Sequence, residues 1–340
     1  MRIAVLFNND YEFVPGAGTD ALAVRASAEA IRDALRAGGH TAELVSLEGR
    51  DLGPVLDQLD RDRPDLVFNL CESLRGVAAH EIAVPAVLDL FHLPYTGGDS
   101  VALGVALSKP RTKDVLIGRG IATPPYRVMA TLADVDRVAA EPLDWPWFLK
   151  LAGEDASVGI TEANVVHDGA ALAARARALF AEFGGAAILA ERYVPGREVN
   201  VTLLGWGPHV EILPLHEIDF AAMPAGRPHI VSYAAKWDEH HVDYAGTKPV
   251  PLRDASPALR AAIERTARAA WEAVGLRDYG RVDLRIDPSG TPWVIDVNPN
   301  CDISPDAGVA RAAASAGMSY PALISRIAEL AARRTGRGGA

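Results

Sequence analysis

The chain has 340 residues, of which 49% are hydrophobic and 23% charged, and its formal net charge is −10. This composition excludes disordered, collagen-like and disulfide-stapled chains. The negative charge disfavours general binding to nucleic acid or to an anionic membrane. Two cysteines, Cys71 and Cys301, are too few for a disulfide framework or a zinc site of their own, and they suit a reducing compartment. No apolar stretch is long enough to span a membrane and no signal peptide is evident, so we expect a cytoplasmic protein.

The first hundred residues alternate between strand-like and helix-like patterns. Short apolar runs predict buried strands, and apolar residues at three- and four-residue steps predict helices. The expected strands are residues 2–7, 41–47 and 65–70, and the expected helices are residues 20–37, 52–60 and 80–91. This alternation is typical of a parallel sheet covered by helices. We therefore expect an α/β protein whose first domain, residues 1–105, contains a Rossmann-like parallel sheet.

The rest of the chain predicts a mixture of helices, strands and one long loop. Helices are expected at residues 99–107, 109–118, 170–183, 256–274, 307–316 and 320–333. Strands are expected at residues 148–151, 188–194, 198–204, 281–286 and 293–297. A tight turn at Pro195-Gly196 is expected to return the chain as the strand 198–204. A second turn, at residues 287–290, joins the last two strands as a hairpin, and residues 218–251 are expected to be a loop.

The hairpin over residues 281–298 is the most informative stretch. Residues two apart on a strand share a face, so Arg281 and Asp283 point one way, and Asp296 and Asn298 point one way on the partner strand. If the register brings these faces together, three oxygen ligands converge beside one guanidinium. Oxygen ligands with few charges suit Mg²⁺, because this ion usually binds one or two protein carboxylates together with substrate phosphates. The alternative is an ordinary hairpin with outward polar residues.

A second signal precedes the hairpin. Lys150 ends an apolar strand and is followed by small and polar residues between Gly153 and Gly159, among them Ser157. Backbone N–H groups in such a loop can hold phosphates, with the lysine as a point charge. The P-loop pattern is absent, and a glycine-bounded loop alone is most often only a hairpin. A lysine followed by such a loop, ahead of a cluster of oxygen ligands in the sequence, is a rarer combination.

In order and spacing, the motifs between residues 65 and 330 resemble those of the ATP-grasp ligases, and among them the D-alanine–D-alanine ligases. The matching segments are residues 94–97 (PYTG), 109–113 (KPRTK), 150–159, 191–198 (ERYVPGRE), 233–236 (YAAK), 280–283 (GRVD) and 296–299 (DVNP). The resemblance implies an ATP-grasp fold in three lobes, at residues 1–105, 106–192 and 193–335, the last being catalytic. It also implies ATP and two Mg²⁺ ions as cofactors, with Mn²⁺ as an alternative ion.

The resemblance implies a nucleotide site built from a set of matching residues. These are Lys109, Lys150, Ser157, Glu191, Tyr193, Val194, Glu198 and Lys236. The first two lysines would hold the α- and β-phosphates, and Lys236, on the long loop, would reach the γ-phosphate. Main-chain groups of residues 191–194 would meet the adenine, and Glu198 would accept hydrogen bonds from the ribose. Lys236 and Ser157 would also act in catalysis.

The reaction implied by the resemblance has two steps. A substrate carboxylate attacks the γ-phosphate of ATP to give an acyl phosphate, and an amine then attacks the acyl carbon while phosphate leaves. The first step brings anions together and needs lysines and two metal ions, with Asp283, Asp296 and Asn298 as the expected ligands. The second step develops an oxyanion that Arg281 would stabilise. The expected partners are small amino acids or carboxylates, neither nucleic acid nor membrane, and a second copy of the chain in a homodimer.

The chain departs from the D-alanine–D-alanine ligase pattern in four places, three on the amino-acid side of the site and one among the metal ligands. The glutamate that binds the first amino acid has no clear counterpart near residues 19–24, Thr-Asp-Ala-Leu-Ala-Val. Ala156 replaces the first of two serines before Ser157, and Trp237 replaces the tyrosine after the loop lysine, so the hydrogen-bonded triad of these ligases cannot form. The metal-bridging glutamate is the shorter Asp296. We therefore expect a different or broader amino-acid substrate, with a true D-alanine–D-alanine ligase as the alternative.

Two other functional classes are alternatives. A nicotinamide-dependent oxidoreductase would use Gly16 and Gly18, but no complete G-x-G-x-x-G motif follows the first strand directly. A non-catalytic ATP-binding module is disfavoured by Arg281, because nucleotide binding alone needs no cation for an oxyanion.

The loop at residues 218–251 is the expected lid and specificity segment. Its His240 and His241 could form a base or a metal site, although exposed loop histidines are usually neither. Cys301 follows the hairpin and has no evident base partner, so it is expected to be small and buried rather than nucleophilic.

Overall fold

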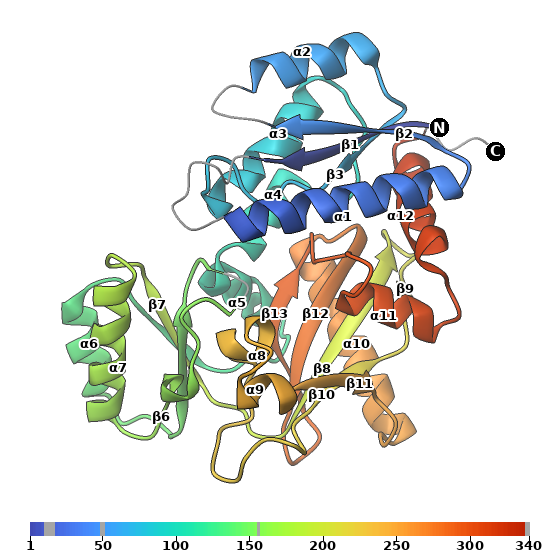
Figure 1. Cartoon of the computed structure of the whole chain (residues 1–340). Coiled ribbons are helices and arrows are strands. Elements are labelled where there is room, and N and C mark those ends of the chain that lie inside the picture. The colour runs from blue at the N-terminus through green and yellow to red at the C-terminus, as the bar shows by residue number, and fades with distance from the viewer. Residues whose placement is uncertain (10–17, 48–51, 155–156, 337–340) are drawn as a thin grey trace.

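The computed structural model describes residues 1–9, 18–47, 52–154 and 157–336 (Figure 1). Its N-terminal part is a three-stranded parallel sheet in the order β2-β1-β3, called here the N-terminal sheet. The strands are β1 (Arg2–Asn8), β2 (Thr41–Leu47) and β3 (Leu66–Asn69). The helices of this part are α1 (Gly18–Ala37), α2 (Gly53–Asp62), a 3₁₀ turn (Ala78–Ile82), α3 (Ala83–Leu90) and α4 (Ser100–Ala106). The parallel sheet predicted from the strand–helix alternation is confirmed.

The central strand β1 is buried on both faces because its side chains alternate between two hydrophobic cores. Val5 and Phe7 pack with α1 and with α12 (Tyr320–Arg334), the last helix of the chain. Ala4 and Leu6 pack on the other face with α2 and α3. The C-terminal helix therefore completes the N-terminal sheet, as the red helix beside the blue one shows in Figure 1.

A second, antiparallel sheet, called here the central sheet, has the strand order β4-β7-β5-β6. Its strands are β4 (Tyr126–Met129), β7 (Ile188–Arg192), β5 (Trp147–Leu151) and β6 (Val165–Val166), with a 3₁₀ turn at Glu162–Asn164 before β6. The helices α6 (Leu132–Ala139) and α7 (Gly169–Glu182) pack on one face. The opposite face of the central sheet, with Phe148 and Lys150 of β5, borders the cleft described below.

The third sheet, called here the C-terminal sheet, has the order β11-β10-β8-β12-β13, and β9 pairs with β8. Its strands are β8 (Arg197–Gly205), β9 (Glu211–Ile212), β10 (His216–Asp219), β11 (Lys248–Pro251), β12 (Asp278–Ile286) and β13 (Pro292–Asn298). Helix α10 (Pro257–Val274) packs on one face, together with Leu116 of α5 (Lys109–Gly118). The short helices α8 (Tyr233–Trp237), α9 (Val242–Ala245) and α11 (Gly308–Ser315) complete this part. Among the described residues, none of the helices is long and apolar enough to cross a membrane.

The turn at Pro195-Gly196 does not close a hairpin, so the prediction of a returning strand was wrong. β7 belongs to the central sheet, whereas β8 pairs with β10 and β12 in the C-terminal sheet. Gly196 has a φ of 118°, and a Cβ there would lie 2.1 Å from the carbonyl oxygen of Ile286. This position therefore needs glycine to pass the chain from one sheet to the next.

Other element predictions need correction. The segment 218–251 is not a plain loop, since it contains the end of β10, α8, α9 and β11. The strand β4 and the helix α6 were missed, and the expected helix 80–91 is divided into a 3₁₀ turn and α3. The glycine-rich segment ahead of α1, with Gly16, and Ala156 of the phosphate loop lie outside the described residues.

Candidate active site

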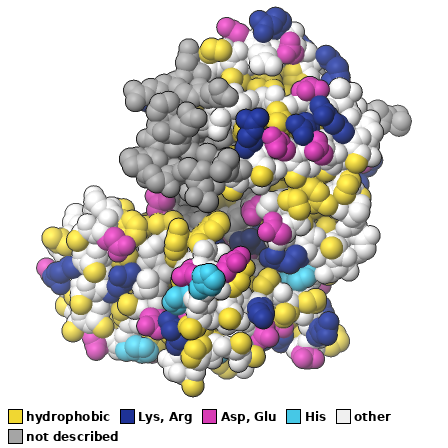
Figure 2. Space-filling view, in the orientation of Figure 1, with side chains coloured by type: hydrophobic (Ala, Val, Ile, Leu, Met, Phe, Trp, Pro, Cys, Tyr) yellow, Lys and Arg dark blue, Asp and Glu magenta, His cyan; other side chains and the backbone are white. Residues whose placement is uncertain are grey.

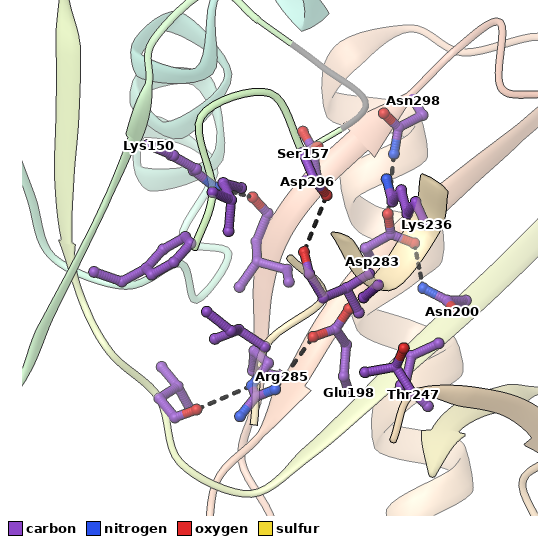
Figure 3. Close-up of a pocket in the computed structure, with 18 of the residues that line it drawn as sticks. Lys150, Ser157, Glu198, Asn200, Lys236, Thr247, Asp283, Arg285, Asp296 and Asn298 are labelled. Carbon is purple, nitrogen blue, oxygen red and sulfur yellow. Dashed lines mark hydrogen bonds and ion pairs between the residues drawn. The ribbon is translucent and has the colours of Figure 1, made fainter. Parts of the chain in front are cut away.

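A cleft of about 640 Å³ lies between the central sheet and the C-terminal sheet. Every residue expected from the sequence to hold nucleotide, metal or oxyanion lines it: Lys109, Lys150, Ser157, Glu191, Tyr193, Val194, Glu198, Lys236, Arg281, Asp283, Asp296 and Asn298. Figure 3 shows how strands of both sheets bring the labelled members of this set around one space. The cleft therefore gathers residues that are up to 189 positions apart in the chain.

The hairpin of β12 and β13 has the register that the sequence argument required. Asp283 pairs with Asp296, and Arg281 pairs with Asn298, so the faces meet. The carboxylate of Asp283 accepts hydrogen bonds from Arg281 at 2.7 and 2.9 Å, from Asn298 at 3.1 Å and from Asn200 of β8 at 2.8 Å. The adjacent Asp283 carboxylate raises the pKa of Arg281, which is therefore charged. A guanidinium and a group of oxygen ligands thus share one end of the cleft.

A buried ion triad supports Lys150. Its Nζ lies 2.9 Å from one carboxylate oxygen of Glu191, and the Nζ of Lys113 lies 2.6 Å from the other. Burial alone would raise the pKa of Glu191, but the two lysines lower it, and burial lowers the pKa of Lys113. The side chains are 3 to 9% exposed. From the sequence, only the main chain of Glu191 is assigned to the adenine hinge. The structure shows that its carboxylate also holds Lys150 in place.

The remaining lysines approach from other elements. Lys109, at the start of α5, is buried and donates to the carbonyl oxygen of Glu154 at 2.7 Å. Lys236, on α8, is exposed within the cleft and in Figure 3 points toward Asp283 and Asn298. Partial desolvation by the cleft walls and the charge of Arg281 lower the pKa of Lys236. The cleft thus contains positive charge from the central sheet, the C-terminal sheet and the helices α5 and α8.

The opposite end of the cleft is organised by Arg285. Its Nε donates to the carbonyl oxygen of Val194 at 3.0 Å, and one terminal nitrogen lies 3.2 Å from Glu198. The guanidinium also lies 5.4 Å from the ring centre of Tyr193. The Tyr193 N–H donates to the carbonyl oxygen of Pro146 at 3.0 Å. These two main-chain groups of the expected adenine hinge are therefore already used within the protein.

The residues present fit a nucleoside triphosphate with Mg²⁺. Arg281 and Arg285 lie four residues apart on the same face of β12, which corresponds to about 13 Å along the strand. Apolar side chains, including Val194 and Ile230, line the Arg285 end, and cations gather at the Arg281 end. Two carboxylates and one amide are hard oxygen donors of the kind that Mg²⁺ uses together with phosphates.

Lys113, Asn200 and Arg285 are site residues that the sequence analysis missed. Asn200 and Arg285 follow the period of two on strands already identified, since Asn200 follows Glu198 on β8 and Arg285 follows Asp283 on β12. That periodicity could have found them. Lys113 lies on a helix, and only the fold shows that it meets Glu191.

His240 and His241 belong to no cluster of metal-ligating side chains in the part of the chain that the structure describes. The described residues contain no group of three or more His, Cys, Asp or Glu side chains placed to bind a metal. His241 instead accepts a hydrogen bond at Nδ1 from the backbone N–H of Asp243, at the start of α9. In Figure 2, histidine side chains gather on the surface over α8 and α9.

Cys301 is buried beside Arg281, as expected from the sequence. Burial raises the pKa of its thiol to about 12, even though Arg281 acts in the opposite direction.

Replacing Cys301 with alanine should leave the ligation rate within about twofold of wild type and lower the unfolding free energy by about 1 kcal/mol. A rate loss above tenfold in a well-folded Cys301→Ala protein would contradict this. Thiol labelling at pH 8 should modify neither Cys71 nor Cys301 until the protein is denatured.

The chain is similar to known proteins over most of its length. The family model described as "D-ala D-ala ligase C-terminus" matches residues 116–329. A D-alanine–D-alanine ligase of Bordetella avium is 30% identical over 301 residues, covering 88% of this chain and 87% of the relative. An uncharacterized protein of Sinorhizobium fredii, y4sG, is 31% identical over 315 residues, covering 90% and 88%.

Solved structures share the fold. The D-alanine–D-alanine ligase of Bacillus anthracis complexed with ATP has a TM-score of 0.71 at 19% identity, over 100% of both chains. The VanG D-Ala:D-Ser ligase of Enterococcus faecalis has a TM-score of 0.71 at 16% identity, over 97% of this chain and 99% of its own. The fold is therefore ATP-grasp, and the chain belongs to the D-alanine–D-alanine ligase family of ATP-dependent, ADP-forming ligases.

Proposed function

We propose that this ligase joins the carboxylate of one amino-acid-type substrate to the amine of another, and that the cleft residues carry out the reaction. The observation that carries the proposal is the convergence of Lys150, Lys236 and Arg281 on the pair Asp283 and Asp296 in one cleft. Mere nucleotide binding needs cations and a hinge, but not a guanidinium beside the metal ligands.

In the first step, an oxygen of the substrate carboxylate bonds to the γ-phosphorus of ATP, and the bond to the β–γ bridging oxygen breaks to release ADP. Lys109, Lys150 and Lys236 neutralise the phosphates as the two anions approach. Asp283, Asp296 and Asn298 would hold two Mg²⁺ ions. Bound Mg²⁺ neutralises and orients phosphate oxygens. Ser157 places the phosphate loop, since its hydroxyl donates to the Val231 carbonyl oxygen at 3.0 Å.

In the second step, the amine nitrogen bonds to the acyl carbon, the carbonyl oxygen takes negative charge, and phosphate then leaves while the nitrogen loses a proton. Arg281 stabilises the oxyanion, because a fixed cation in a partly dry cleft needs no reorganisation. Asp283 holds its guanidinium through two hydrogen bonds. A second guanidinium, Arg311 of α11, lines the same end of the cleft and would attract a carboxylate on the amine substrate.

At the other end, residues 191–194 and Glu198 would hold the adenosine. Glu198 would accept hydrogen bonds from the ribose hydroxyls, and one of its carboxylate oxygens also accepts from Arg285. Main-chain groups of this hinge would meet the adenine edge. Arg285 keeps the Val194 segment and Glu198 together, so base and sugar contacts depend on the same side chain.

We infer that the substrate pair differs from two D-alanines. Trp237 is a described residue of α8, and its indole cannot supply the tyrosine hydroxyl of the substrate-loop triad. The VanG relative, named a D-Ala:D-Ser ligase, supports the idea that this fold accepts a changed amino acid. The competing proposal is an ordinary D-alanine–D-alanine ligase.

We also propose that the three sheets correspond to lobes at residues 1–105, 106–192 and 193–335, and that the chain forms a homodimer through its first lobe. Exposed apolar side chains on neighbouring segments of that lobe support the dimer: Val77, Ile82, Leu90 and Val101. Leu116 of α5 packs into the core of the C-terminal sheet, so this helix joins two lobes.

The test is ADP release and product mass for pairs of D- and L-amino acids and small carboxylates, with ATP and Mg²⁺. We expect one pair other than D-alanine with itself to give the highest kcat/KM, and chelation of Mg²⁺ to abolish turnover. Efficient ligation with D-alanine alone would refute the altered substrate. ATP binding without ligation of any pair would favour a non-catalytic module.

A further inference from the structure

The lid, defined here as residues 227–247, carries Lys236 but has little hydrophobic support of its own. Its helices α8 and α9 have five and four residues, which is too short for stability without tertiary contacts. Large apolar side chains of the lid remain exposed: Tyr233, Trp237, Val242 and Tyr244. Polar contacts must therefore hold Lys236 in its place.

Those contacts converge on Asp243, which is 5% exposed. One carboxylate oxygen accepts a hydrogen bond from the Ser232 hydroxyl at 2.7 Å, and the other lies 3.3 Å from Nε of Arg227. The backbone carbonyl of Asp243 accepts from the Thr247 hydroxyl at 2.7 Å. Both ends of the lid therefore meet at one residue, the first end through its carboxylate and the second through its backbone carbonyl.

The contact with Ser232 reaches α8 directly. Ser232 is the N-cap of α8, and its hydroxyl oxygen accepts from the Ala235 N–H at 3.1 Å, one residue before Lys236. A cap side chain fixes the direction in which a short helix starts. Because the Asp243 carboxylate orients the Ser232 hydroxyl, it also sets the orientation of α8.

The lid is tied to the phosphate side of the cleft as well. Arg227, which pairs with Asp243, lies 3.0 Å from Glu162, ahead of β6. The Tyr233 N–H donates to the Ile160 carbonyl oxygen at 3.0 Å, and Ser157 donates to Val231. The lid therefore contacts the segment at residues 157–162, which begins within the last part of the expected phosphate loop.

We propose that Asp243 is a positioning residue that holds Lys236 over the reacting phosphate and keeps water out while the acyl phosphate is present. The inference rests on the role proposed for Lys236. Asp243 lines none of the cleft itself and acts through Ser232 and Arg227. In this chain, a carboxylate inside the lid supplies an anchor where Trp237 offers no hydroxyl.

The matched test compares Asp243→Asn with Asp254→Asn, an exposed carboxylate three residues beyond β11. Asp243→Asn should lower the kcat of ligation about tenfold or more, as expected when a buried charge-assisted hydrogen bond is lost, with a smaller change in the KM for ATP. The ratio of ADP released to product formed should rise above that of wild type. Asp254→Asn should match wild type in all three quantities.

A second readout is independent of turnover. Trypsin cleavage after Lys236, followed by fragment mass, reports the order of the lid, and Asp243→Asn should accelerate it about tenfold. Ser232→Ala should behave in the same way, and the double variant Ser232→Ala with Asp243→Ala should be no worse than Asp243→Ala alone. A lid cleaved as slowly as in wild type, or faster cleavage with unchanged coupling of ADP to product, would overturn the proposal. If the wild-type protein ligates no substrate pair, the proposed function is refuted. The cleavage result would still test whether Asp243 orders the lid.

Discussion

Arg281→Ala should lower the kcat of ligation by about 100- to 1,000-fold, which is the usual loss when one group that stabilises an oxyanion is removed. The affinity for ATP should change little, because the phosphates retain Lys109, Lys150 and Lys236. Arg281→Lys should recover only part of the rate, since an ammonium cannot form the two parallel hydrogen bonds to Asp283. Steady-state rates of product formation and calorimetric titration of ATP measure the two quantities.

The control for Arg281→Ala is Arg265→Ala on α10, which removes a guanidinium outside the cleft. It should leave both quantities at wild-type values. An Arg281→Ala enzyme that ligates within tenfold of wild type would exclude the oxyanion role. An equal loss in ATP affinity and in rate would instead assign Arg281 to nucleotide binding.

Glu191→Gln should lower the free energy of unfolding by about 3 kcal/mol or more, because two buried ammonium groups lose their shared counter-charge. Lys113 and Lys150 lie 2.6 and 2.9 Å from its carboxylate. Chemical denaturation measures the loss. The kcat/KM for ATP should fall as well, since the ion pair with Glu191 holds the Lys150 ammonium in place at the cleft.

The double variant Lys113→Met with Glu191→Gln separates charge balance from packing. It removes one buried cation together with the buried anion, so it should be more stable than Glu191→Gln alone. Glu264→Gln, at an exposed position of α10, is the matched control and should be neutral. A Glu191→Gln protein as stable as that control would contradict the triad.

The active-site hairpin could be predicted from sequence, but the register that joins its two polar faces could not. The period of two places Arg281 with Asp283 and Asp296 with Asn298. The pairs next to the turn, Leu284 with Val294 and Arg285 with Trp293, would by regular continuation leave Asp283 and Asp296 on opposite faces. A shift of one residue between Asp283 and Leu284, a β-bulge, brings the two faces together. The same periodicity extends to Arg285, which was overlooked since no chemistry in the sequence demanded it.

Partners across the fold could not be predicted in this way. Nothing near Lys113 indicates that its ammonium meets Glu191, 78 positions later. The turn at Pro195-Gly196 resembles that of a hairpin, because local geometry does not specify which sheet the next strand joins. In contrast, the missed helix α6 had a local signal in the capping box of Thr131 and Asp134.

The edge of β13 connects the two walls of the cleft. Thr123 donates to the Val294 carbonyl oxygen at 2.8 Å, the Val294 N–H donates to the Ala122 carbonyl oxygen, and Lys150 donates to the Ile295 carbonyl oxygen at 3.2 Å. These hydrogen bonds join the central sheet, and the segment ahead of it, directly to the edge strand of the C-terminal sheet. Ile295 is followed by Asp296, so a single residue links the lysine on one wall of the cleft to the carboxylate on the other.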